Sequence, residues 1–242
     1  MLTAAAWGLL GASSLLIGAV LGLVLRIPER AVGLILGFGA GTLISAVAFE
    51  LTEEAYALGG ADTVALGLAL GALTYFTGDE LLIGKGTKDP TAGRGASESD
   101  DARALVLGAV LDGIPESAVI GLSLLGGGSV AVPVLAAVFI SNLPESISSS
   151  TEMRSAGVGN RHVIAVWLSV MLVSALAAAI GYGLLAGASD DWVGLIEAFA
   201  GGAVLTMLAD TMMPQAFREG GRAVGLLTVF GFSLAYLLST LE

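Results

Sequence analysis

Two short motifs place a proline and a carboxylate, together with other oxygen-bearing side chains, inside apolar sequence. The first reads DGIPES and begins at Asp112, and the second reads SNLPES and begins at Ser141. In each motif the first residue and the glutamate (Glu116 or Glu145) are four positions apart, so the two are predicted to share one helix face. Proline donates no backbone hydrogen bond and collides with the carbonyl four residues back, so both helices are predicted to kink there.

Two such helices facing each other would surround a pocket lined with oxygen atoms. A carboxylate at bilayer depth is costly and usually functional, and oxygen ligands suit hard divalent cations. The predicted metal ligands are Asp112, Glu116, Ser141, Asn142 and Glu145. The alternative is two ordinary proline kinks with acids solvated near the membrane surface. The repetition of the motif in the middle of two apolar segments favours the metal site.

The composition indicates a membrane protein. Hydrophobic residues make up 55% of the 242 residues and charged residues only 13%, and the mean hydropathy is +0.89. A soluble domain carries about twice that share of charge. We therefore expect an all-α membrane protein, with residues 1–242 forming one transmembrane domain. The chain has no cysteine, so it can form neither a disulfide framework nor a thiolate metal site.

Eight apolar segments approximate the length of about 20 residues that a helix needs to cross a bilayer. They are Leu2–Leu25, Ala31–Ala57, Asp62–Ile83, Ala104–Leu125, Val130–Glu152, Val163–Leu185, Trp192–Met213 and Ala223–Leu241. The first has no basic stretch before it, so it is interpreted as a span and not as a cleaved signal peptide. Residues 84–103, rich in Gly, Ser, Asp and Lys, are expected to form a flexible cytoplasmic loop.

The basic residues test this span count independently. All ten lie in, or at the edges of, the connections between spans 1 and 2, 3 and 4, 5 and 6, and 7 and 8. Under the positive-inside rule these connections are cytoplasmic, and both termini are then extracytoplasmic. The expected location is the cell membrane, crossed several times.

The chain also contains an internal repeat. Residues 33–60 align without gaps to residues 194–221, with nine identical positions of 28. The charge rule gives spans 2 and 7 opposite directions, so the copies are inverted; spans 4 and 5 are interpreted as a second inverted pair. Inverted repeats with interrupted helices and a polar site at mid-membrane are typical of secondary transporters. Chance similarity between helices rich in Gly and Ala is the alternative.

Further acids lie in the repeated spans. Glu50, Glu53 and Glu54 lie towards the outer end of span 2, where they either face water or form an electronegative mouth that concentrates cations. Asp210 lies towards the inner end of span 7 and is a candidate for lining an exit path.

Together these features resemble the ZIP (Zrt/Irt-like) metal transporters, in particular their prokaryotic branch. The family carries His-Asn-x-Pro-Glu-Gly in its fourth span, where this chain has the motif at Asp112. It carries Gln-Asn/Asp-x-Pro-Glu-Gly in its fifth span, where this chain has the motif at Ser141. The segments 199–202 and 213–214 also look like the family's seventh span. The resemblance implies eight spans in a 3+2+3 arrangement, import of divalent metal cations to the cytoplasm through a midplane site between helices 4 and 5, and a homodimer.

The departures from the family pattern concern the ligands. Asp112 stands where the family has histidine, and Gly113 stands where it has asparagine. Span 6, around residues 170–174, has no carboxylate where many relatives supply a further ligand, so a two-metal site is not expected. A divalent ion such as zinc, manganese or iron is expected as the substrate, with no prosthetic group and no nucleic-acid partner.

Two alternatives to a transporter remain open. An intramembrane hydrolase would use Asp112, Glu116 and Asp79, since Thr77-Gly78-Asp79 loosely matches a protease signature. The lack of an HExxH motif and the unexplained inverted repeats count against it. The other alternative is a homologue that binds metal without transporting it. We therefore expect a transporter and not an enzyme.

Overall fold

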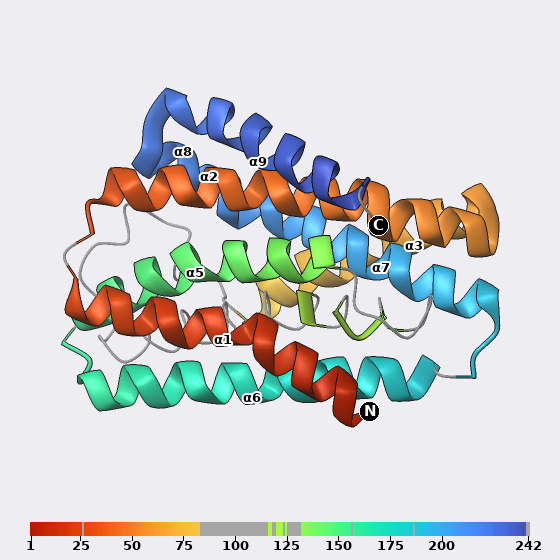
Figure 1. Ribbon diagram of the computed structural model, residues 1–242, viewed down its shortest axis with the longest axis horizontal. Helices are drawn as coiled ribbons and strands as arrows, with labels where there is room; N and C mark the ends of the chain where they lie inside the picture. Colours follow the sequence, from red (N-terminus) through yellow and green to blue (C-terminus); the bar gives the residue numbers. More distant parts are fainter. Residues whose placement is uncertain are drawn as a thin grey trace.

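The computed structural model describes residues 1–25, 27–82, 116–117, 120–122, 124, 132–155, 157–185 and 187–240. These residues are almost entirely helical and include no strand, and the long helices lie side by side in an elongated bundle (Figure 1). Four helical stretches within them are long and apolar enough to cross a membrane: Leu2–Val24, Glu29–Leu81, Asn160–Gly183 and Asp190–Ser239. The prediction of an all-α membrane protein is confirmed for this part of the chain.

Helices are the expected elements because lipid offers no water to backbone N–H and C=O groups, and a helix satisfies them internally. The elements are α1 (Leu2–Val24), α2 (Glu29–Ala46), η1 (Val47–Leu51), α3 (Thr52–Leu82), α5 (Val132–Ser155), α6 (Asn160–Leu185), α7 (Asp190–Met207), η2 (Leu208–Met212), α8 (Met213–Gly220), η3 (Gly221–Ala223) and α9 (Val224–Ser239). Two of them, η1 and η2, are π-helical turns that continue α2 into α3 and α7 into α8.

Two glycines interrupt the longest stretches. Gly60 lies inside α3 with φ 74° and ψ −176°, and Gly221 follows α8 with φ 68° and ψ −157°. This backbone region is open essentially to glycine alone, because a Cβ atom would clash there. Each glycine therefore ends one helical segment, the first leg of the repeat, and starts a second segment, the second leg. The 53-residue and 50-residue apolar stretches are divided into two legs each in this way.

The internal repeat is present in the structure with the offset found in the sequence. The π turns begin at Val47 and Leu208, which are 161 residues apart, and α2 and α7 begin 161 residues apart as well. The repeats therefore agree in helix start, in π turn and in the glycine that ends the first leg.

The two repeats run antiparallel to each other. Gly33, near the start of the first, packs against the backbone of Gly220 at the end of the second. Gly194, near the start of the second, packs against Ala55 towards the end of the first leg. This head-to-tail relation is what inverted copies require.

The second legs are exchanged between the repeats. Helix α3 packs along α7, and α9 packs along α2. Gly202 of α7 lies against the carbonyl of Leu68, and Gly41 of α2 lies against the carbonyl of Thr228 in α9. Small residues at such crossings let helix backbones approach closely in a membrane. The two crossings are equivalent, so an approximate two-fold relation links the repeats.

Helix α5 runs between α1 and α2, and α6 packs on the far side of α1 (Figure 1). Gly18 of α1 lies against the carbonyl of Leu143, and Gly39 of α2 lies against the backbone of Ser141. The buried residues along the second half of α5 are largely polar and include Ser141, Asn142, Ser146, Ser148 and Ser150. This helix therefore supplies a polar strip to the interior of an apolar bundle.

The two ends of the bundle differ in charge. The start of α2, the start of α6 and the turn η3 lie at one end, and the bend inside α3 and the start of α7 lie at the other (Figure 1). Every basic residue of the described ranges lies at the first end: Arg30, Arg154, Arg161, Arg218 and Arg222. One of them, Arg154, donates from Nη1 to the carbonyl of Leu23 (2.6 Å), where it meets the negative end of α1. The predicted alternation of basic and non-basic connections holds in this part of the bundle.

The observed helices match the predicted spans to within a few residues at most ends. Helix α5, which carries the second proline motif, stays helical through Pro144. The predicted fourth span lies mostly outside the described residues, and the predicted loop 84–103 lies wholly outside them. The eight-span 3+2+3 arrangement therefore stays a prediction.

Candidate metal centre

A hydrogen bond joins the two proline motifs. The hydroxyl of Ser141 donates to Oε1 of Glu116 across 3.2 Å. The same hydroxyl lies 3.0 Å from the carbonyl of Val138, one turn earlier in α5, so its single proton serves either acceptor. Glu116 is 1% exposed and Ser141 is fully buried. The structure thus brings the two motifs together inside the bundle.

The other ligands predicted on α5 lie beside this contact. Asn142, next in the chain, is 3% exposed, and Glu145 is half-buried one turn further on. Ser141, Glu145 and Ser148 are spaced four and three residues apart, so they share one face of α5. The polar face therefore continues from the buried contact towards the basic end of the bundle.

A small pocket borders Glu116 and is otherwise apolar. Its lining comes from three directions: Leu43, Ala46, Val47 and Leu51 of the first repeat, Val134 and Val138 of α5, and Val204 of α7. The π turn η1 contributes Val47 and Leu51, and π turns often occur at functional sites. A carboxylate in such surroundings is stable as an ion only if a cation or hydrogen-bond donors accompany it.

The complete predicted ligand set is not assembled within the described residues. Among them, no group of three or more His, Asp or Glu side chains lies close enough to hold a metal ion. Asp112, the predicted third carboxylate, lies outside the described ranges. The metal-binding role of Asp112, Glu116, Ser141, Asn142 and Glu145 therefore stays a prediction.

The predicted pathway residues lie on the repeats. Glu50 lies in the π turn η1 and is half-buried, whereas Glu53 is exposed in the first turn of α3. Asp210 is exposed and lies in the equivalent π turn η2. Glu50 and Asp210 thus occupy corresponding turns of the two inverted copies.

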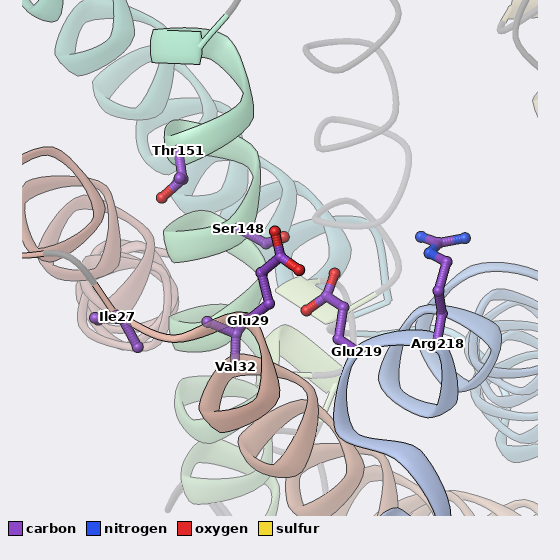
Figure 2. Close-up of a pocket in the computed structure, with 7 residues that line it drawn as sticks. All are labelled: Ile27, Glu29, Val32, Ser148, Thr151, Arg218 and Glu219. Carbon is purple, nitrogen blue, oxygen red and sulfur yellow. The ribbon is translucent and has the colours of Figure 1, made fainter.

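A cleft opens at the basic end, between α2, α5 and α8. It is lined by Ile27, Glu29, Val32, Ser148, Thr151, Arg218 and Glu219 and has a volume of about 270 Å³. Figure 2 shows the carboxylates of Glu29 and Glu219 directed towards each other, while the guanidinium of Arg218 points away from both. Despite the basic residues around it, the interior of this cleft is acidic.

The cleft is connected to the polar face of α5. Ser148 lies seven residues after Ser141, which is about 10 Å along the helix axis. Gln215 of α8 reaches this face: its Nε2 donates to Oγ of Ser148 (2.7 Å) and to Oε1 of Glu219 (2.9 Å). The first of these bonds ties α8 to α5, and the second, within α8, holds the Gln215 amide in place.

Several acids that no sequence motif singles out lie in notable positions in the structure. Glu197 of α7 is 2% exposed. It is a carboxylate inside a predicted span, which is the same signal that marks Glu116 in the sequence. Glu29 and Glu219 adjoin arginines at helix ends, where they resemble ordinary surface acids. Asp79, named for the hydrolase alternative, is 4% exposed near the end of α3.

These features describe a helical membrane protein with antiparallel internal repeats and a buried carboxylate at its centre. No family model matches the chain. It is 26% identical over 206 residues to a protein of Arabidopsis thaliana named a "putative zinc transporter". The match covers 84% of this chain, and this chain spans about a third (33%) of the length of that relative.

Proposed function

We propose that this chain transports divalent metal cations across a membrane, in the manner of the ZIP family that its motifs resemble. The observation that carries the proposal is the contact between Ser141 and Glu116. It joins the two proline motifs at a buried position, 1% and 0% exposed, inside a bundle of apolar helices. The plant relative named for zinc transport supports the same class of substrate.

The proposed site lies near the bilayer midplane, between the fourth and fifth of eight spans in a 3+2+3 arrangement. Glu116, Ser141, Asn142 and Glu145, with Asp112, supply oxygen donors to the cation. Removing a divalent cation from water is costly, and only several anionic or dipolar oxygens together offset that cost. The carbonyl of Ile140 is a further donor, since Pro144 has no N–H to bond it.

Alternating access follows from the repeats. Two antiparallel copies related by an approximate two-fold axis can rock about a fixed site and expose it to either side in turn. The cation enters past Glu50 and Glu53 and leaves along α5 past Glu145, Asp210 and the cleft of Glu29 and Glu219. Under the positive-inside rule the basic end is cytoplasmic, so both termini are extracytoplasmic. Import towards the cytoplasm is what the resemblance to the ZIP family implies. The functional unit is a homodimer in the cell membrane.

The deciding experiment measures uptake of zinc, manganese and iron(II) into proteoliposomes. Glu116→Gln and Glu145→Gln keep the side-chain size and remove a charge, so each is expected to lower uptake of every transported ion by at least about tenfold. Asp191→Asn is the matched control, because Asp191 is exposed at the start of α7, far along the bundle from Ser141. Its uptake is expected to equal that of the unaltered protein.

Other outcomes separate the alternatives. Unaltered uptake in the Glu116 and Glu145 variants removes these residues from the site. Metal binding by calorimetry without flux of any ion identifies a homologue that binds metal but does not transport it. Cleavage of a membrane-embedded peptide, abolished by Asp79→Asn, identifies the hydrolase.

A further inference from the structure

Glu197 has an unusual environment for an acid. It lies in the second turn of α7, is 2% exposed, and its Oε2 atom is buried without a hydrogen-bond partner among the described residues. Its neighbours in α7 are apolar or small, with Ala198 fully buried and Gly194 and Gly201 also buried. A lone ionised carboxylate is too costly in such a place, so a partner has to neutralise it.

The partner that the fold brings to Glu197 is a second acid. Because the first leg of the repeat runs antiparallel to α7, Gly194 packs near Leu58 and Gly201 packs near Leu51. Midway between these contacts, the antiparallel packing places Glu197 at the level of Glu54. Glu54 is half-buried in α3 of the first repeat, and Glu197 belongs to α7 of the second. Because α3 packs along α7, the two acids lie at the seam, that is, the contact surface between the two repeats.

Among the described residues, none near Glu197 is a cation. The elements packed against this part of α7 are α3 and η1, and their titratable groups nearby are all acids or tyrosine: Glu50, Glu53, Tyr56 and Asp62. The first two residues of α7, Asp190 and Asp191, are also acids. Basic residues of the described chain lie at the opposite end of the bundle. No lysine or arginine of the described ranges therefore neutralises Glu197.

We propose that Glu54 and Glu197 form a proton-binding pair, a carboxylic acid hydrogen-bonded to a carboxylate, that fastens α3 to α7. Two neighbouring carboxyl groups in an apolar site cannot both be ionised, because their negative charges repel each other. One shared proton removes this repulsion and supplies a hydrogen-bond donor to the unpartnered oxygen of Glu197. A divalent cation fits less well, since it needs more oxygen ligands than two carboxylates and no third acid completes a cluster in the described residues. The pair is independent of whether the chain transports metal.

Infrared spectroscopy of the purified protein in lipid nanodiscs tests the pair directly. A protonated carboxyl group has its own C=O stretching band, which disappears when the proton leaves. The spectrum of the unaltered protein minus that of Glu197→Gln is expected to contain one such band at neutral pH, and this band is expected to vanish as the pH is raised. Glu54→Gln is expected to alter the same band. A difference spectrum without a protonated carboxyl band at any pH overturns the proposal.

Thermal stability provides the second measurement. The folded pair holds a proton that separated carboxylates release, so stability falls as the pH rises through the point where the pair loses that proton. The unaltered protein is expected to lose about 2–4 °C in Tm over this range. Glu197→Gln carries a neutral donor at every pH, so its Tm is expected to stay level.

Glu53→Gln is the matched control, because it removes the same charge one residue from Glu54 but from an exposed side chain. It is expected to keep both the infrared band and the pH dependence of Tm. If Glu53→Gln levels the Tm curve as Glu197→Gln does, the effect is general surface charge and the pair is disproved. Glu197→Gln with an unaltered pH dependence also disproves it.

Discussion

Gly60 and Gly221 have nearly the same backbone conformation, φ 74° with ψ −176° and φ 68° with ψ −157°, although 161 residues separate them. Each ends the first leg of a repeat at opposite ends of the bundle. The sequence identity of the repeats is low, so this shared conformation is a structural signature of common architecture. It also gives the first prediction.

Replacing Gly60 or Gly221 by alanine is expected to destabilise the protein by about 1–3 kcal/mol, because a Cβ atom is strained in this backbone region. Neither position has a neighbour within 4 Å of an added Cβ, so the cost is conformational and not steric. Melting in detergent measures it. Gly225→Ala is the control, since Gly225 is helical with open space around it and alanine favours a helix. Equal melting temperatures for all three variants would contradict the prediction.

The equivalent crossings at Gly41 and Gly202 give the second prediction. An alanine Cβ at Gly41 would overlap the backbone of Thr228, and one at Gly202 would overlap the backbone of Leu68. Because backbone cannot move aside cheaply, each substitution is expected to cost at least about 1–3 kcal/mol. The fraction of monodisperse protein in size-exclusion chromatography measures the effect. Recovery matching that of Gly225→Ala would show that the crossings tolerate added volume.

The bridge made by Gln215 gives the third prediction. Gln215→Ala removes the 2.7 Å hydrogen bond that ties α8 to Ser148 of α5, together with the 2.9 Å bond to Glu219 within α8. The bond between the helices contributes about 0.5–1.5 kcal/mol, so opening of the cleft is expected to become easier and uptake about two- to tenfold faster. Ser148→Ala is expected to act in the same direction. Ser155→Ala, an exposed serine bonded only within α5, is the control. Uptake unchanged by the first two variants would exclude a gating role.

The fourth prediction concerns the choice of metal. Imidazole suits zinc, whereas carboxylate, amide and hydroxyl oxygens suit harder ions such as manganese. Asp112→His is therefore expected to raise the ratio of zinc flux to manganese flux in the same liposomes. The ratio is the informative quantity, because zinc binds more tightly than manganese at most sites. An unchanged ratio would mean that Asp112 does not select the metal.

Much of the fold follows from local chemistry that the sequence contains directly. Apolar segments of membrane-spanning length must be helical because lipid cannot satisfy the backbone. Arginine placement predicted which connections share an end, and the described connections agree. The offset of 161 was readable from the glycine pairs at the ends of the repeats. Even the polar character of α5 was evident from its motif.

Contacts between distant segments were not readable in this way. The two π turns have no sequence signal that distinguishes them from α-helix, because they arise where packing shifts the hydrogen-bond register. The packing of α3 on α7 and of α9 on α2 depends on which glycine-lined helix faces contact each other. Nothing local to Gln215 indicates that its amide reaches Ser148, 67 residues away.

The carboxylates show the division most clearly. The sequence by itself determined that Glu116 and Glu145 lie within apolar segments, since that follows from hydropathy. Only the tertiary structure decided that Ser141 donates to Glu116, and that Glu197 is buried at the level of Glu54 where the two repeats pack together. The physical reason is that a side chain's electrostatic environment is set by the helices packed around it. That packing depends on the summed shape of many apolar residues and not on any motif.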